Sequence, residues 1–92
     1  MAGSRSIITV VGKDQVGIIA KVCTYLSDNN INILDISQTI VSGFFNMMMI
    51  VDIKAKDDDF LRISDELIAL GRSIGVEIKL QREEIFSLMQ RV

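Results

Sequence analysis

The order of strand-like and helix-like patterns is the feature that most constrains how this chain can fold. Apolar or alternating runs typical of strands are interrupted twice by segments whose apolar residues recur at helical spacing. In chain order the sequence predicts a strand over 6–11, a helix over 15–28, strands over 31–41 and 44–53, a helix over 57–74, a strand over 76–81 and a short helix over 83–91.

Two strand–helix–strand units are joined by Ser42 and Gly43, a tight-turn signal that predicts a hairpin. This order is typical of the α+β class, in the form of a ferredoxin-like βαββαβ sandwich. We expect an antiparallel four-stranded sheet of order 4-1-3-2, with two helices on one face and a short C-terminal helix. The first and third strands are the most apolar, as central strands should be, while polar residues mark the second and fourth as edges. All 92 residues are expected to form one domain, with 1–5 as an N-terminal lead and 83–92 as a C-terminal helical extension.

Alternation along the strands divides their residues between the two faces of the predicted sheet. The face under the helices is expected to carry Ile8, Val10, Leu34, Ile36, Met47, Met49, Val51, Ile78 and Leu80. The opposite face is expected to carry Ile7, Val11, Ile33, Phe44, Met48 and Ile50. So much apolar surface is unfavourable in water on a small protein. We therefore expect an oligomer, most simply a dimer, with the C-terminal helix of this chain or of a partner as a cover.

Composition argues against several classes of function. The net charge of −2 disfavours nonspecific binding to nucleic acid. The chain has no histidine and one cysteine, which excludes an intrachain disulfide framework and a cysteine zinc cluster and leaves few groups for acid–base catalysis. No apolar run approaches the roughly twenty residues of a membrane span, and the first apolar run is too short for a signal peptide. A cytoplasmic protein is expected.

Four smaller patterns are interpreted as structural. The aspartates at 57–59 favour a helix start over a metal site. The methionines at 47–49 cannot converge on one ion along a strand, so we expect them to fill a core and an interface. Cys23 lies on an apolar helix stripe and is expected to be a small core residue. Phe44 and Phe45 cluster at one strand end, which, with the acidic charge, argues against RNA recognition.

The turn between the first strand and the first helix carries the only ligand-like chemistry in the sequence. Asp14 is predicted to cap the helix by accepting from backbone N–H groups. Gly17 is predicted to lie in the first helical turn, where its missing Cβ lets a ligand approach N–H groups that suit a carboxylate or phosphate. An ordinary capped turn explains the same residues without a ligand. Lys13 is the only cation in this loop, and with no glycine-rich phosphate loop we expect no catalytic role.

Three segments together resemble the ACT domain family. They are V-V-G-K-D at the end of the first strand, D-Q-V-G-I-I-A in the turn, and N-N-I-N-I-L-D-I after the first helix. The chain most resembles the small stand-alone prokaryotic type related to the glycine cleavage system repressor, and the resemblance extends from Ile7 to Arg91. It implies a homodimer in which two copies pair along their second strands and pack their first helices together.

In ligand-binding ACT domains an amino acid lies at that seam. The resemblance implies that one wall of the site is formed by Gly12, Lys13, Asp14, Gln15, Val16, Gly17 and Ile18, with Asn32 facing them from the partner subunit. The alternative for Asn32 is that it only completes the turn before its strand. Many ACT sites have a proline where Val16 stands, and its absence makes this loop less rigid.

The resemblance implies a non-catalytic regulatory module, an amino-acid sensor that acts through its dimer interface on an unidentified partner protein. Its ligand would stabilise one arrangement of the dimer and so shift the affinity for that partner. No cofactor and no metal ion are expected. The alternative is a protein–protein interaction and dimerisation domain that binds no ligand.

Overall fold

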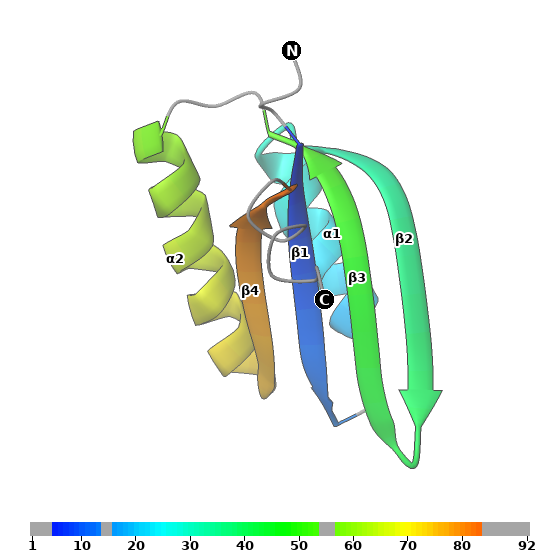
Figure 1. The fold of residues 1–92 in the computed structure, drawn as a ribbon. Coiled ribbons are helices and arrows are strands. Elements are labelled where there is room, and N and C mark those ends of the chain that lie inside the picture. The colour runs from blue at the N-terminus through cyan, green and yellow to red at the C-terminus, as the bar shows by residue number, and fades with distance from the viewer. Residues whose placement is uncertain (1–4, 14–15, 54–56, 84–92) are drawn as a thin grey trace.

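Within the residues that the structure describes, six helices and strands follow one another in the predicted order (Figure 1). The computed structural model describes residues 5–13, 16–53 and 57–83. Its elements are β1 (Arg5–Lys13), α1 (Ile18–Asp28), β2 (Asn32–Val41), β3 (Phe44–Asp52), α2 (Asp57–Ile74) and β4 (Val76–Arg82). Most bounds lie within a residue or two of the predicted ones, and the start of α1 is the largest difference. The helix predicted over 83–91 lies outside the described residues after Glu83.

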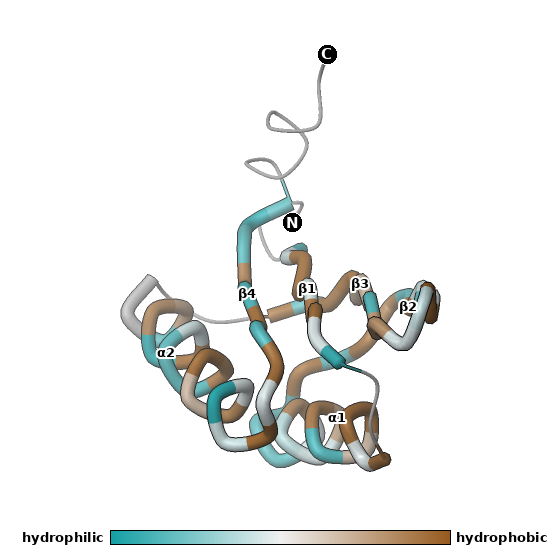
Figure 2. The backbone as a smooth tube through the Cα atoms, turned by 90° about the horizontal axis from the view of Figure 1, so that it is seen from below, coloured by the Kyte–Doolittle hydropathy of each residue, from teal (hydrophilic) through white to brown (hydrophobic). Residues whose placement is uncertain are grey.

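The four strands form one antiparallel sheet of order β2-β3-β1-β4, which confirms the predicted topology. Both helices lie on one side of this sheet (Figure 2). The β2–β3 hairpin turns at Ser42 and Gly43, whose φ angles of 52° and 81° are both positive, as a type I′ turn requires. The sheet therefore has one face under the helices and one open face, and β2 forms one of its edges.

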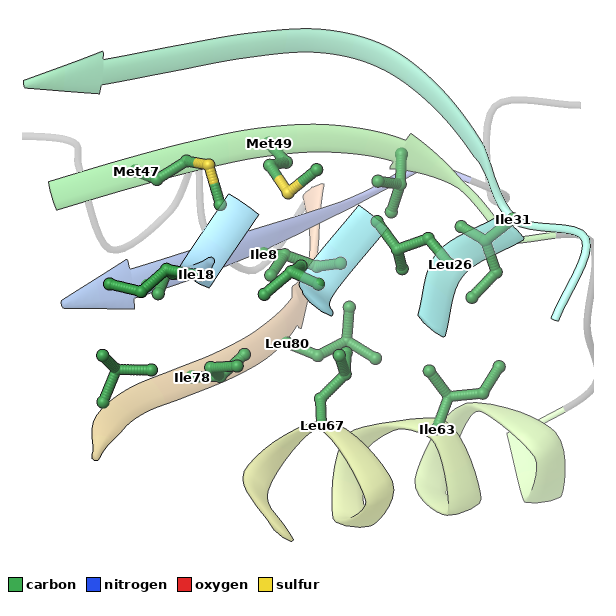
Figure 3. Packing of buried hydrophobic residues seen from close by; sticks show 14 of the residues in the cluster. Ile8, Ile18, Leu26, Ile31, Met47, Met49, Ile63, Leu67, Ile78 and Leu80 are labelled. Atoms are coloured by element: carbon green, nitrogen blue, oxygen red, sulfur yellow. The ribbon is translucent and has the colours of Figure 1, made fainter. Parts of the chain in front are cut away.

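The hydrophobic core lies between the sheet and the two helices (Figure 3). Alternation in β3 directs Met47 and Met49 into this core, where they are 3% and 0% exposed, while Met48 on the other face is 38% exposed. Fully burying a side chain of this size contributes about 1.5–3 kcal/mol to folding. The prediction that the three methionines do not converge on one ion is confirmed. The predicted core residues of β1 and β4, Ile8, Val10, Ile78 and Leu80, are buried as well.

The residues of β2 were assigned to faces less accurately. Leu34 and Ile36, expected under the helices, are 46% and 41% exposed, and Ile33, expected on the open face, packs against the core. A β-bulge between Ile33 and Asp35 is the cause, because one unpaired residue reverses the alternation. Ile36 does pair with Met49 on the helix side, but it lies on the edge strand and stays half in water.

Candidate ligand site at the start of α1

The loop between β1 and α1 brings most of the predicted site residues to one end of the sheet. Gly12 and Lys13 end β1, and Gly17 precedes α1. Val16 is fully exposed, whereas Ile18 is 2% exposed and its side chain belongs to the core. Ile18 can therefore contribute to a site only through its backbone. Asp14 and Gln15 lie outside the described residues. The prediction that Asp14 is the N-cap is wrong, because α1 begins at Ile18 and its N-cap is Gly17.

Gly17 has a different role from the one the sequence predicted. The helix begins at Ile18, so Gly17 is the N-cap residue and does not lie in the first helical turn. Its φ of 94° lies in the left-handed region, which explains a glycine here. A Cβ added at Gly17 would meet no atom within 4 Å, so close packing within the chain is not the reason.

The start of α1 has a positive local charge. Gly17 has no side chain that could cap the helix, and its carbonyl accepts the first helical hydrogen bond from the Lys21 N–H at 3.0 Å. The N–H groups of the first turn of α1 point out of the helix, and that turn contains no acidic residue. The helix dipole and the ammonium group of Lys21, one turn further on, both favour an anion at this position.

A cavity of about 180 Å³ lies at this helix start. It is lined by Val16, Gly17, Ile18, Lys21, Ser73 and Ile74. Lys21, Ser73 and Ile74 were not predicted. Helical spacing from Gly17 points to Lys21, because residues four apart lie on one side of a helix. Only the packing of α2 reveals Ser73 and Ile74. The volume is smaller than the roughly 300–1,000 Å³ of typical ligand pockets, which limits what one chain alone can enclose.

Gly12 is explained by packing inside the chain. A Cβ at this position would lie 2.7 Å from Cγ1 of Val76, its cross-strand neighbour on β4. Glycine at position 12 thus lets β1 and β4 stay paired beside the bulky Val76 side chain. Packing against Val76 is therefore enough to explain Gly12, whether or not the loop binds a ligand.

Strand β2 begins at Asn32. The start of β2 lies at the other end of the sheet from the loop between β1 and α1 (Figure 1). Asn32 pairs with Asp52, which pairs in turn with Arg5 at the start of β1. Strand β1 has nine residues from Arg5 to Lys13, so its two ends lie about 26 Å apart along the strand. One chain therefore does not bring Asn32 to the loop, and only a second chain can supply an Asn32 there.

The described residues with shifted pKa values lie away from this loop, between α1 and α2. The hydroxyl of Tyr25 donates a hydrogen bond of 2.6 Å to Oε1 of Glu66. Burial, followed by this hydrogen bond and the charge of Glu66, raises the pKa of Tyr25. The same hydrogen bond, followed by nearby Arg62, lowers the pKa of the Glu66 carboxyl. This contact links the two helices and has no visible chemical role.

The other sequence patterns form no second site in the described part of the chain. Cys23 is half-buried and packs against the core, as predicted. Phe44 is exposed on the open face while Phe45 is buried, so the two rings do not share a surface. Among the described residues, no three His, Cys, Asp or Glu side chains gather as a metal ion would require. Within the same residues, no helix has the length and apolarity needed to cross a membrane.

The sequence of this chain matches a known protein family over most of its length. The family model described as the ACT domain matches residues 4–81. A UPF0237 protein of Bifidobacterium longum is 61% identical over 89 residues, which are 97% of this chain and 99% of that protein.

Solved structures share the fold. An ACT domain protein from Streptococcus pneumoniae superposes with a TM-score of 0.79 at 41% identity, over 89% of this chain and 92% of that one. A structure assigned to a glycine cleavage system transcriptional repressor superposes with a TM-score of 0.73 over 85% of this chain and 44% of that one. Its 23% identity indicates a common fold and no more.

Proposed function

The chain belongs to the ACT domain family, a family of regulatory ligand-binding modules, and we propose that it binds a small amino acid where two copies of the chain meet. In this role it performs no chemistry on its ligand. It acts as a sensor that passes the occupancy of its site to a partner protein.

The positive start of α1 is the observation that carries this proposal. Backbone N–H groups, with Lys21 beside them, suit the carboxylate of an amino acid. The cavity of about 180 Å³ has room for the carboxylate and α-carbon groups, and a second chain would enclose the rest of the ligand. The fully exposed Val16 leaves one side of this cavity open to a second chain.

Strand directions explain how a second chain can complete the site. Strands β1 and β2 both run antiparallel to β3, so they end at the same end of the sheet, where α1 begins. If two copies pair along β2 about a two-fold axis, the two β2 strands run antiparallel. The partner's β2 then begins beside the end of this chain's β2. Its asparagine at position 32 can both donate to and accept from the ligand.

Exposed apolar residues on β2 and its hairpin support this pairing. Those that are 41–57% exposed are Leu34, Ile36, Ile40, Val41 and Phe44. An edge strand with exposed apolar side chains is prone to pair with another chain, and natural proteins usually blunt such edges. Pairing between copies would bury these side chains and satisfy the edge N–H and C=O groups. Ligand bound at the seam would then favour one arrangement of the dimer.

A thermal-shift panel of the common amino acids tests the sensor proposal. A ligand at a hundred times its dissociation constant adds about 2.7 kcal/mol of stability. Asn32→Ala and Asp14→Ala should abolish the shift caused by the active amino acid. Asn46→Ala removes an exposed asparagine of β3 outside the predicted site, and it should keep the full shift. Equal shifts in all four proteins would show that the site is elsewhere.

The second candidate is a dimerisation and interaction domain without a ligand. The apolar β2 edge favours it equally, because that edge requires a partner but no small molecule. The same panel separates the two functions. If no amino acid shifts the unfolding temperature while the chain is still a dimer, the interaction domain is the correct function.

A further inference from the structure

One residue on the open face of the sheet is buried although neither helix covers that face (Figure 2). Along β1 and β3, apolar open-face residues are 38–52% exposed at Val11, Phe44 and Met48. Ile7 lies on the same face and is only 6% exposed. The exposed fraction of these side chains is therefore low at the Ile7 end of the open face and high towards the other end.

Neighbours within the sheet do not account for this difference. Ile7 pairs with Ile50 and Gln81, and Val11 pairs with Asn46 and Glu77, so each has two flanking side chains. Side chains on a sheet stand roughly perpendicular to it, and flanking strands leave their outer ends in water. Burial of Ile7 therefore requires atoms above the sheet at this end.

The chain leaves β4 towards this end of the open face. Oε2 of Glu83, the residue directly after β4, lies 3.0 Å from Nη2 of Arg5. Arg5 stands two residues before Ile7 on β1 and therefore projects from the same face. An exposed ion pair of this kind adds at most about 1 kcal/mol, so its value here is that it fixes the direction of the chain.

The next nine residues, 84–92, lie outside the described residues, and their sequence suits such a cover. Their apolar residues are Ile85, Phe86, Leu88 and Met89. As a helix, nine residues extend about 13 Å, enough to cross β4, β1 and β3 at this end of the sheet, since neighbouring strands lie about 5 Å apart. We propose that residues 84–92 dock with their apolar side chains on the open face of their own chain, over Ile7 and Ile50. Because the Arg5–Glu83 ion pair forms within one chain, it favours docking of this segment on its own chain over exchange with a second copy.

Thiol labelling in the full-length chain tests this docking. In a Cys23→Ala background, Ile50→Cys introduces a single thiol beside Ile7, and Val11→Cys introduces one at the far end of the same face, where Val11 is 45% exposed. Phe86→Asp should release the segment and speed maleimide labelling at position 50 about tenfold, as expected if the segment is docked about nine-tenths of the time. Ser87→Asp adds the same charge at the neighbouring polar position and should leave that rate unchanged.

Labelling at position 11 should be fast in every variant, and circular dichroism of each variant checks that the sheet is still folded. If Phe86→Asp leaves labelling at position 50 unchanged, the segment does not cover the face and the proposal is wrong. If protection at position 50 is lost on dilution, the segment is exchanged between copies, which overturns docking within one chain.

Discussion

The two loop glycines show that one residue type in a motif can have separate physical causes. Gly12 is required because a side chain would collide with Val76. Gly17 is required because its φ of 94° is strained for any residue with a Cβ. Neither cause involves a ligand directly, yet Gly17 leaves the N–H groups of α1 uncapped by its own side chain. The helix dipole supplies the partial positive charge at this loop, and glycine at position 17 leaves that charge without a side-chain cap.

Gly12→Ala should lower the free energy of unfolding by about 1–3 kcal/mol, because the new methyl group overpacks the contact with Val76. Denaturant unfolding of a double-mutant cycle checks the cause. Val76→Ala removes the nearest colliding atom, Cγ1, and leaves Cβ at 3.0 Å, so the double variant should lose less than the sum of the two single losses. Strictly additive losses would show that the collision is relieved in another way.

At the scale of elements, a polar contact connects the two helices that lie on the same side of the sheet. The hydrogen bond from Tyr25 on α1 to Glu66 on α2 is their clearest polar link, and Arg62 approaches Glu66 to 3.1 Å. Burial disfavours the charged tyrosinate, and the hydrogen bond favours the charged carboxylate. This link therefore depends on pH at both ends of the scale.

The stabilising effect of this link should be greatest between about pH 5 and pH 10. The raised pKa of Tyr25 stabilises the fold below 10.0, and this stabilisation is lost as the pH rises further, because the unfolded chain ionises first. The lowered pKa of Glu66 stabilises the fold above 4.5, and this stabilisation is lost as the pH falls below that value. The stability difference between the native protein and Tyr25→Phe should shrink at both extremes.

The chain has one tyrosine, so ultraviolet titration of tyrosinate reads Tyr25 alone. In the folded protein the transition should lie above pH 10, and in concentrated urea it should return to the ordinary tyrosine value. A folded transition at or below that value would contradict the proposed link between the helices.

At the scale of the whole molecule, the apolar surface of a single chain is unevenly distributed. The helix side of the sheet is closed by the core, whereas β2 is exposed along nearly all of its length. A small monomer rarely leaves such a surface in water. The proposed contact between copies is therefore expected at β2.

If the proposed dimer forms along β2, Ile36→Lys should convert it into a monomer. Ile36 lies near the middle of β2, so a two-fold axis there would bring the two lysines close together, and like charges at an interface are strongly unfavourable. Light scattering at micromolar concentration measures the change, with circular dichroism to confirm the fold. Leu61→Lys is the matched control, since Leu61 is 62% exposed on α2, and it should remain a dimer. A native protein that is already a monomer would contradict the contact at β2.

The sequence alone determined the fold of this chain, because its strong signals are local. Alternation in β3 and β4, the Ser42–Gly43 turn and the end of α2 before Gly75 all reflect preferences of neighbouring residues, and the structure confirms each of them. Sequence also directed attention to the loop before α1, through Gly17.

Only the tertiary structure decided how that loop is built and what surrounds it. Contacts between distant residues determine that Val76 accounts for Gly12, that Ser73 joins the cavity, and that a bulge reverses the side-chain pattern of β2 after Ile33. The strand directions place Asn32 at the end of the sheet opposite the loop. Sequence periodicity describes one element at a time, whereas a site made by several elements depends on how they pack.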